Sequence, residues 1–579
     1  MGQEVRRATH PDIQSLANSL TKLGHEFEWV RDPSDMAKAD KLLFPGVGAF
    51  GTAMEALSKK GYLEPLRAYI KSGKPYMGIC VGMQALFEGS DESPDVPGLG
   101  ALVGRVGRFS ATDASGKVRK AVPHIGWSKA TVPAYDGNVQ GLGEAYGLDG
   151  DEYYYFVHSY RVAFTPELAN VTLTTTQYGD ETYVSSVQYN NIFATQFHPE
   201  KSGAAGLRVL AAWLARNNEP LSVPRTLSAP ANAPYTMPTR RIVACLDVRS
   251  NDQGDLVVTK GESYDVRERT GASDVRNMGK PVELAQRYYD EGADEVAFLN
   301  ITSFRNWALT DQPMLTLLQR AAETIFVPLT IGGGIRDYTD PDGSVHPALD
   351  VAHAYFRAGA DKVSIGSEAV FAVERLVERS TALGGSADPG QAPDAALKQD
   401  TGIEQISHMY GSQAVVVSID PKRVYVDGGA VPPAHVASLV SGPDEREGHS
   451  GMAQWWYACT VKGGRETRDV DVVQLARGVE RLGAGELLIN SIDRDGSNAG
   501  FDTQLVDLVR ASVAISVIAS SGAGKPSHFS EVFSPRDAAG GAVIEAALAA
   551  GIFHRREVSI EEVKQALVQE GVEVRMSRS

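Results

Sequence analysis

Residues 240–579 contain an internal repeat that restricts the possible fold more than any other feature of the chain. Eight short apolar runs alternate with stretches of helical periodicity, and the first four runs resemble the last four. "EGADEVAFLNIT" is echoed by "LGAGELLINSID", and "VPLTIGGGI" by "SVIASSGAG", so that Glu295 pairs with Glu486 and Gly332 with Ser521 at nearly the same offset. Eight strands separated by helices predict a parallel (β/α)8 barrel, here built of two half-barrel repeats.

A proline-rich segment separates this repeat from a different N-terminal domain. Residues 217–239 carry five prolines and no helical or strand period, which predicts an extended, semi-rigid connector. The 579 residues are too many for one core, so we expect one domain over 1–216 and the barrel over 240–579. Two stretches rich in Gly, Pro, Ala and Asp, near 383–402 and 427–452, are expected to be surface insertions in the barrel.

Residues 1–216 are predicted to form an open α/β sheet. The apolar runs that end in glycines or polar groups are "KLLFPGVGAFG", "PYMGICVG", "YYYFVHSY" and "NNIFATQFHPE". Chemistry in such sheets is found at the carboxyl ends of the strands. A candidate site is therefore expected where these runs end.

Charge and composition argue against several classes of protein. The formal net charge is −16 and no basic stripe appears, so we expect no nucleic-acid partner. No apolar stretch of about 18 residues is present, so no membrane span is expected, and the N-terminus lacks the apolar core of a signal peptide. The three cysteines favour a reducing compartment, by default the cytoplasm. No Cys/His ligand cluster appears, so neither a metal nor an organic cofactor is expected.

Cys80 lies where an apolar run turns into a helical pattern. The sequence Gly78-Ile79-Cys80-Val81-Gly82 matches a nucleophile elbow, a tight turn that needs glycine on both sides. Such a turn would place the sulfur at a helix N-terminus, which favours the thiolate. The alternative is a buried structural cysteine, which the flanking glycines make less favoured.

A thiol nucleophile needs a base and a group that orients the base. His198 and Glu200 are two residues apart, so on an extended segment both side chains point to the same side. His198 could accept the thiol proton while Glu200 holds the imidazole, which makes a Cys-His-Glu triad. The glycines of "FPGVGAFG" would let backbone N–H groups face a developing oxyanion.

Two aspartates close equivalent strands of the two half-barrels, Asp247 in "ACLDV" and Asp420 in "VSIDP". Carboxylates at the carboxyl ends of barrel strands lie on the catalytic face, and a pair of them can act as general acid and base. A single Asp at such a place more often caps the following loop. The symmetric pair favours catalysis.

Turns of glycine and other small residues follow the third and fourth strands of each half-barrel. Such turns, when they lead into helix N-termini, bind phosphate through backbone amides. Each half-barrel contributes one pair of such turns, and two pairs related by the half-barrel repeat imply a ligand with a phosphate at each end. The turn residues are Gly333, Gly334, Gly366, Ser367, Ser521, Gly522, Gly524, Ala550 and Gly551.

Four charged residues stand at or near the starts of predicted barrel strands: Arg241, Glu295, Lys362 and Glu486. Charges at strand starts are usually solvated ends. Two positive and two negative side chains around one end of a barrel could instead neutralise one another.

The motifs of the first domain together resemble the class I (triad) glutamine amidotransferases. The closest resemblance is to the glutaminase domain of the imidazole glycerol phosphate synthase family, and it covers most of residues 40–206. It implies Cys80 as nucleophile, His198 as base and Glu200 as orienting group. It also implies an oxyanion hole and a glutamine site formed by Val47, Gly48, Val81, Gln84, His158, Ser159 and Tyr160.

The barrel resembles the cyclase half of the same family, whose substrate is the elongated bisphosphate PRFAR. "RRIVACLDV", "ADKVSIG", "SIDRDGSNAG" and "IASSGAGK" carry this resemblance. It implies Asp247 and Asp420 as catalytic residues, Lys260 in a mobile loop after strand one, and a gate for ammonia made by the four charged residues at the barrel bottom. The further residues expected to line the site are Asn300, Asn490, Asp493, Asp495 and Gly496.

The two resemblances imply a bifunctional enzyme of the fused fungal and plant type. It would hydrolyse glutamine, pass ammonia through the barrel and convert PRFAR to imidazole glycerol phosphate and AICAR. Its partners would be these small molecules, with the two domains docked within a monomer. One departure is that residues 1–12 contain no convincing strand, so either the start is misassigned or the sheet lacks its first strand. The alternatives are therefore an ammonia-dependent cyclase with an impaired glutaminase, and a non-catalytic sensor of a phosphorylated metabolite.

Overall fold

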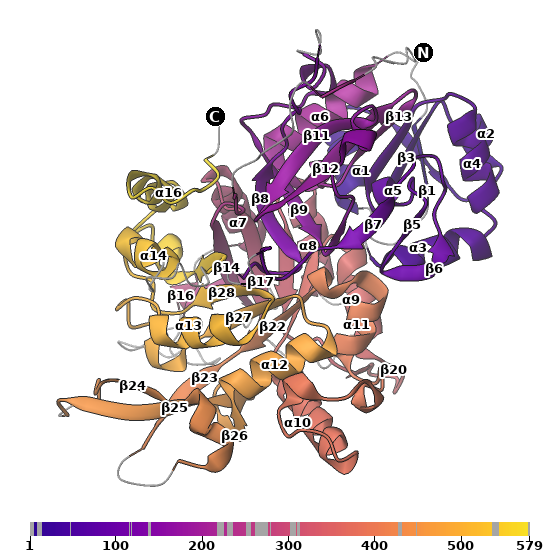
Figure 1. Cartoon of the computed structure of the whole chain (residues 1–579). Coiled ribbons are helices and arrows are strands. Elements are labelled where there is room, and N and C mark those ends of the chain that lie inside the picture. Colours follow the sequence, from indigo (N-terminus) through magenta and orange to yellow (C-terminus); the bar gives the residue numbers. More distant parts are fainter. Residues whose placement is uncertain are drawn as a thin grey trace.

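The computed structural model describes most of the chain. The described residues are 5–8, 14–46, 48–114, 116, 119–136, 141–216, 225–227, 235–250, 256–260, 276–277, 280–301, 309, 313–426, 431–446, 449–534 and 544–576. The N-terminal domain lies against one end of a barrel, and an arm of strands projects from the barrel on the opposite side (Figure 1).

The N-terminal domain is built on a seven-stranded sheet with helices on its faces (Figure 1). In spatial order the strands are β11 (Thr172–Tyr178), β12 (Glu181–Tyr189), β13 (Ile192–Thr195), β4 (Tyr76–Cys80), β3 (Lys41–Gly46), β1 (Val5–Ala8) and β2 (Phe27–Val30). The five strands from β13 to β2 run parallel. The helices are α1 (Gln14–Lys22), α2 (Asp35–Lys38), α3 (Phe50–Lys59), α4 (Leu63–Lys71), α5 (Val81–Gln84) and α6 (Gly203–Ala215). The predicted open α/β sheet is confirmed.

The sequence left open a misassigned start or a sheet without its first strand, and the second alternative was wrong. Strand β1 pairs in parallel with β2 on one side and with β3 on the other. Its sequence, "VRRA", is short and half arginine, so no hydrophobic pattern marks it as a strand. Pairing on both sides satisfies its backbone N–H and C=O groups whatever its side chains are. The β4 strand that carries Cys80 therefore lies within a continuous sheet.

Eight parallel strands of the second domain close into a barrel, as predicted. They are β14 (Arg241–Ser250), β17 (Glu295–Asn300), β18 (Leu329–Gly332), β21 (Lys362–Ile365), β22 (Val415–Ile419), β27 (Glu486–Asn490), β28 (Ser516–Ser520) and β29 (Ala546–Ala549). Pairing of β14 with β29 closes the barrel. The helices are α7 (Pro281–Asp290), α8 (Pro313–Ala322), α9 (Ala348–Arg357), α10 (Ser367–Ala382), α11 (Gly402–Tyr410), α12 (Val472–Leu482), α13 (Thr503–Ser512), α14 (Pro526–Phe533), α15 (Gly551–His554) and α16 (Ile560–Gln569).

The described residues of both predicted insertions form short elements of the barrel domain. The first, near 383–402, forms two short 3-10 helices, Pro389–Gln391 and Asp394–Ala396, and buries Ala396. The described parts of the second contribute the 3-10 helix Pro433–Ser438 and a strand of the projecting arm. The strands of this antiparallel arm are β23 (Pro421–Tyr425), β24 (Val440–Pro443), β25 (Met452–Val461) and β26 (Glu466–Asp471).

The N-terminal domain contacts the end of the barrel at which the strands begin. The Trp127 indole N–H donates to the carbonyl oxygen of Asp294 over 3.3 Å, and the Val122 N–H donates to that of Ala514 over 2.9 Å. The Lys201 ammonium lies 2.6 Å from the Asp361 carboxylate. Strands β17, β21 and β28 begin one or two residues after Asp294, Asp361 and Ala514, respectively. The base of the barrel is therefore covered by the other domain.

Candidate active sites

Cys80 ends β4 in a strained turn. Its φ of 52° and ψ of −107° lie in a region that side chains other than glycine rarely adopt. A Cβ atom at Gly82 would lie 2.0 Å from the Phe44 carbonyl oxygen, and one at Gly78 would lie 2.4 Å from that of Gly82. Only glycine fits at these two positions, which is the backbone geometry expected of a nucleophile elbow.

His198 and Glu200 form the second part of this site. The His198 Nδ1 lies 2.8 Å from Glu200 Oε1, and both side chains are buried. Burial alone would lower the pKa of His198, but the charges of Glu200 and Cys80 outweigh it and raise that pKa well above 6.5. The imidazole is therefore suited to hold a proton beside the sulfur and to release it to a leaving group.

A chain of side-chain amides leads from Cys80 to the predicted glutamine site. Gln196 Nε2 lies 3.4 Å from Cys80 Sγ, and Gln84 Nε2 donates to Gln196 Oε1 and to the Tyr160 carbonyl oxygen, both over 3.0 Å. Gln196 was not among the predicted site residues. Its place two residues before His198, on the same side of an extended segment, is the signal that could have identified it.

The remaining predicted residues of this site lie around the same turn. His158 Nδ1 donates to the Tyr160 carbonyl oxygen over 2.8 Å, and burial lowers the pKa of His158 to about 3, so its ring is neutral. Ser159 is buried between the two. Val81 follows Cys80 directly, and Gly48 has a φ of 113° that favours glycine. Val47 lies outside the described residues.

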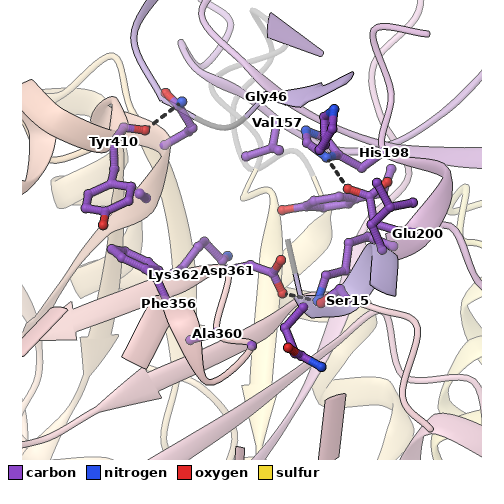
Figure 2. Close-up of a pocket in the computed structure, with 18 residues that line it drawn as sticks. Ser15, Gly46, Val157, His198, Glu200, Phe356, Ala360, Asp361, Lys362 and Tyr410 are labelled. Atoms are coloured by element: carbon purple, nitrogen blue, oxygen red, sulfur yellow. Dashed lines mark hydrogen bonds and ion pairs between the residues drawn. The ribbon is translucent and has the colours of Figure 1, made fainter. Parts of the chain in front are cut away.

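A cavity lies between the Cys80 site and the base of the barrel (Figure 2). Residues of both domains line it, including His198 and Glu200 on one side and Asp361 and Lys362 on the other. The space open to a water-sized molecule is about 50 Å³, enough for a few molecules as small as water or ammonia. Tyr155, which the sequence did not single out, also lines the cavity, and burial followed by the charge of Glu295 raises its pKa well above 10.

The four charged residues predicted at the barrel bottom form a closed ring of ion pairs. Arg241 donates to Glu295 over 2.8 Å and also to Glu486, while Lys362 Nζ lies 2.7 Å from Glu295 and 2.6 Å from Glu486. All four side chains are buried. Burial alone would raise the pKa of Glu486, but Arg241 and Lys362 outweigh it and hold that pKa below 4.5. They are therefore not solvated strand ends.

Strand β14 joins this ring to the opposite end of the barrel. Arg241, Val243, Cys245 and Asp247 alternate along it, and side chains two residues apart point to the same face. Val243 and Cys245 belong to a small apolar cluster whose other buried members are Ala297, Val416, Leu488, Ile518, Ala546 and Leu548. This cluster lines the barrel interior over the ~20 Å that six residues of extended strand span between Arg241 and Asp247.

Asp247 and Asp420 lie at the far end of the barrel on opposite sides, since three strands separate β14 from β22 in either direction. Burial, followed by the charge of Asp495, raises the pKa of Asp247 to about 6. The pKa of Asp420 is also raised by burial and by Asp495, although a 2.9 Å hydrogen bond from Asn490 Nδ2 opposes the shift. Both carboxyl groups are thus tuned toward the pH range in which they can exchange protons.

The predicted phosphate turns also lie on opposite sides of this end. The turns after β18 and β21 are neighbours, as are those after β28 and β29. Gly333 must be glycine, because a Cβ there would lie 2.2 Å from the Asn300 carbonyl oxygen. The Gly524 N–H is not open to a phosphate as it stands, because it donates to His528 Nδ1 over 3.1 Å. The Ser367 hydroxyl accepts the Lys462 N–H over 2.9 Å.

The other predicted residues of the turns and mouth occupy the same end of the barrel. Gly334, Gly366, Gly496, Ser521, Gly522, Ala550 and Gly551 lie in turns after strands or at helix starts, and Asp493 is in a 3-10 helix after β27. Lys260 belongs to the hairpin strand β15 (Leu256–Lys260), but its side chain lies outside the described part of the chain.

Comparison with known proteins follows the same two-domain division. The family described as "Glutamine amidotransferase class-I" matches residues 13–215, and the one described as "Histidine biosynthesis protein" matches residues 241–388 and 391–559. Imidazole glycerol phosphate synthase hisHF of Schizosaccharomyces pombe is 52% identical over 570 residues, which cover 97% of this chain and 98% of that protein. The chain belongs to the fused imidazole glycerol phosphate synthase family.

Relatives of this family occur in fused and in separate form. The chloroplastic hisHF protein of Arabidopsis thaliana is 48% identical over 567 residues, which cover 98% of this chain and 88% of that protein. The HisF subunit of Methanocaldococcus jannaschii matches 59% of this chain at 36% identity. The predicted identity is confirmed: the chain is an enzyme with glutamine amidotransferase and cyclase domains.

Neither a metal-ligand cluster nor a membrane-spanning helix is present among the described residues. They contain no group of three or more His, Cys, Asp and Glu side chains that could hold a metal ion. No helix in the described ranges is long and apolar enough to cross a membrane.

Breaking the ring of charges is expected to destabilise the synthase strongly. Lys362→Met leaves two buried carboxylates with Arg241 alone, and breaking a buried pair costs about 3–5 kcal/mol. Urea denaturation of the barrel measures this loss. The control is Lys462→Met, which removes an exposed pair with Glu466 in the arm of the barrel domain and should cost about 1 kcal/mol or less. Equal losses in the two variants would contradict a ring that stabilises the barrel.

Proposed function

We propose that the enzyme converts glutamine and PRFAR into glutamate, imidazole glycerol phosphate and AICAR, with the residues of the two sites in the following roles. The observation that carries the proposal is a shared cavity. It touches His198 and Glu200 of one domain and Lys362 of the charged ring of the other. Two unrelated activities would not need a shared cavity between them.

In the first half-reaction Cys80 acts as the nucleophile. Its sulfur attacks the side-chain carbonyl carbon of glutamine, and His198 transfers the thiol proton to the departing nitrogen, which leaves as ammonia. Backbone N–H groups near Gly48 and Val81 stabilise the oxyanion. Water then cleaves the glutamyl thioester with His198 as base, releasing glutamate and restoring the thiol.

Ammonia reaches the second site without entering solvent. The cavity accepts a molecule of its size, and the barrel interior beyond the ring is apolar. Neutral NH3 can cross such an interior, whereas desolvation disfavours NH4⁺. The ring of Arg241, Glu295, Lys362 and Glu486 closes the entrance, so a change in these ion pairs is required for passage.

In the second half-reaction ammonia attacks PRFAR at the mouth of the barrel. The turns after β18 and β21 hold one phosphate, and those after β28 and β29 hold the other. The substrate then spans the space between Asp247 and Asp420, which transfer protons during ring closure and cleavage. Asn490 keeps the Asp420 carboxyl oriented.

Turnover of PRFAR with two nitrogen sources tests this function. Imidazole glycerol phosphate and AICAR are expected with glutamine and with ammonium salts. Product with ammonium but none with glutamine would instead favour the cyclase with an impaired glutaminase. The reason for that alternative was a missing first strand, and the paired strand β1 removes it. No product from either source would exclude the synthase. We also expect a monomer acting in the cytoplasm, which sedimentation and cell fractionation measure.

Turnover with ammonium is expected to fall as the pH decreases through about 6, because the buried Asp247 then takes up a proton and can no longer act as a base. The rate should be measured at a fixed concentration of free NH3. In Asp495→Asn this loss should move to lower pH, because the charge of Asp495 raises the pKa of Asp247. An unchanged midpoint in that variant would assign the titration to another group.

A further inference from the structure

The described part of the proline-rich connector is bound to the glutaminase domain at two places. The first is Arg225, whose side chain is 5% exposed. Its guanidinium donates to the Thr172 carbonyl oxygen over 2.6 Å, to Gln188 Oε1 over 2.9 Å, and to the Gln188 carbonyl oxygen. Its backbone N–H donates to Asn170 Oδ1 over 3.2 Å. The prediction of an extended connector therefore omitted a buried charged anchor within it.

The neighbours of Arg225 strengthen this anchor. The Asp136 N–H donates to the Thr226 carbonyl oxygen over 2.7 Å, and Leu227 pairs with Tyr135 in an antiparallel bridge. The Tyr135 hydroxyl also donates to the Thr172 carbonyl oxygen over 2.8 Å. The connector thus covers part of β11, which is the edge strand of the seven-stranded sheet.

The second attachment lies at the end of the connector. Thr236 and Gly179 exchange two backbone hydrogen bonds of 2.7 and 3.2 Å, and the Thr239 N–H donates to the Trp127 carbonyl oxygen over 3.0 Å. Two residues later the chain enters β14 at Arg241, the first member of the charged ring. The described parts of the connector, 225–227 and 235–239, therefore both contact the glutaminase domain, and the second part leads into the entrance of the barrel.

A buried guanidinium that binds only uncharged oxygens has a positional role. All three described side-chain bonds of Arg225 go to amide oxygens, and such bonds hold a planar fork in one orientation. Removing the guanidinium group would leave these buried oxygens with fewer hydrogen-bond donors, which would destabilise the folded protein. The proline content of the segment between the two attachments predicts a semi-rigid chain. A semi-rigid chain fixed at both ends transmits the position of one end to the other better than a flexible tether does.

We propose that Arg225 is a positioning residue for ammonia transfer. It fixes the connector to the glutaminase domain, and the fixed connector holds the start of β14, with Arg241, against the outlet of the Cys80 site. Loss of this anchor loosens the contact between the domains, and ammonia then escapes to solvent. The inference rests on the proposed function, because Arg225 would position the two domains for the ammonia transfer proposed there.

The test compares Arg225→Ala with Arg208→Ala in the full-length enzyme. Arg208 is half exposed on the same domain and pairs with Glu152 at the surface. For each variant we would measure imidazole glycerol phosphate formed per glutamate released, turnover with ammonium, and hydrogen exchange of the Thr236 and Thr239 amides. A coupling ratio is independent of the amount of folded protein, so a general loss of stability does not change it.

In Arg225→Ala the coupling ratio is expected to fall at least about twofold, while ammonium-dependent turnover stays within about 1.5-fold of the parent enzyme. The Thr236 and Thr239 amides should exchange faster, and Arg208→Ala should match the parent in every measurement. Arg225→Lys keeps the charge but not the planar guanidinium group, so it should show an intermediate coupling ratio. If Arg225→Ala does not fold, Arg225→Lys provides the same test.

An unchanged coupling ratio in Arg225→Ala or Arg225→Lys would overturn the proposal. A parent enzyme that forms no imidazole glycerol phosphate from glutamine would instead refute the proposed function. The two failures are therefore distinguishable in one experiment.

Discussion

Cys80→Ser is expected to abolish glutamine-dependent turnover and to leave ammonium-dependent turnover intact. Serine fits the strained turn after β4, but its hydroxyl is a far weaker nucleophile than a thiol beside His198. Loss of a nucleophile that acts together with its base lowers the rate by roughly 10³-fold or more. The barrel site does not use Cys80 when ammonia is supplied, so PRFAR turnover with ammonium should change by less than about twofold.

The control for this variant is Ser58→Ala. Ser58 is an exposed residue on α3 of the same domain. It should keep glutamine-dependent turnover. If Cys80→Ser retained more than about a tenth of the parent rate with glutamine, Cys80 would not be the nucleophile.

Asp420→Asn is expected to abolish product formation with both nitrogen sources. Asparagine has the same size and can still accept the hydrogen bond from Asn490, but it cannot exchange a proton. Loss of general acid–base catalysis lowers turnover by roughly 10²–10⁴-fold. Steady-state formation of AICAR from PRFAR measures the effect, once with glutamine and once with ammonium.

The matched control is Asp290→Asn at the exposed end of α7. Its carboxylate accepts a hydrogen bond from Gln286, which asparagine can also accept, so turnover should equal that of the parent. Unchanged AICAR formation in Asp420→Asn would remove Asp420 from the catalytic pair and with it the symmetric assignment of Asp247.

Much of the two sites could be predicted because their residues are marked by local pattern. The glycines around Cys80 are required by close backbone contacts within a few residues of chain, and Asp247 and Asp420 end strands that repeat. The ring residues Arg241, Glu295, Lys362 and Glu486 each begin a barrel strand. Once parallel strands are predicted, the strand ends that meet in space follow from the barrel geometry.

Other parts of the fold and the sites could not be predicted, because no local sequence pattern identifies them. Strand β1 lacks a hydrophobic period because its pairing with β2 and β3 uses only the backbone. Gln196 gains its role from the Cys80 sulfur, 116 positions away in the chain. Lys201 and Asp361 are ordinary charged residues until the two domains dock and bring them to 2.6 Å.

The sequence by itself determined the two folds, the nucleophile with its base, and the pair of aspartates, because each depends on the order of residues along one or two strands. Only the tertiary structure decided how the sites are joined. The shared cavity, the closed ring of ion pairs and the buried Arg225 anchor all arise where segments far apart in the chain pack together. Such contacts depend on burial and on the relative placement of two domains, which no local pattern specifies.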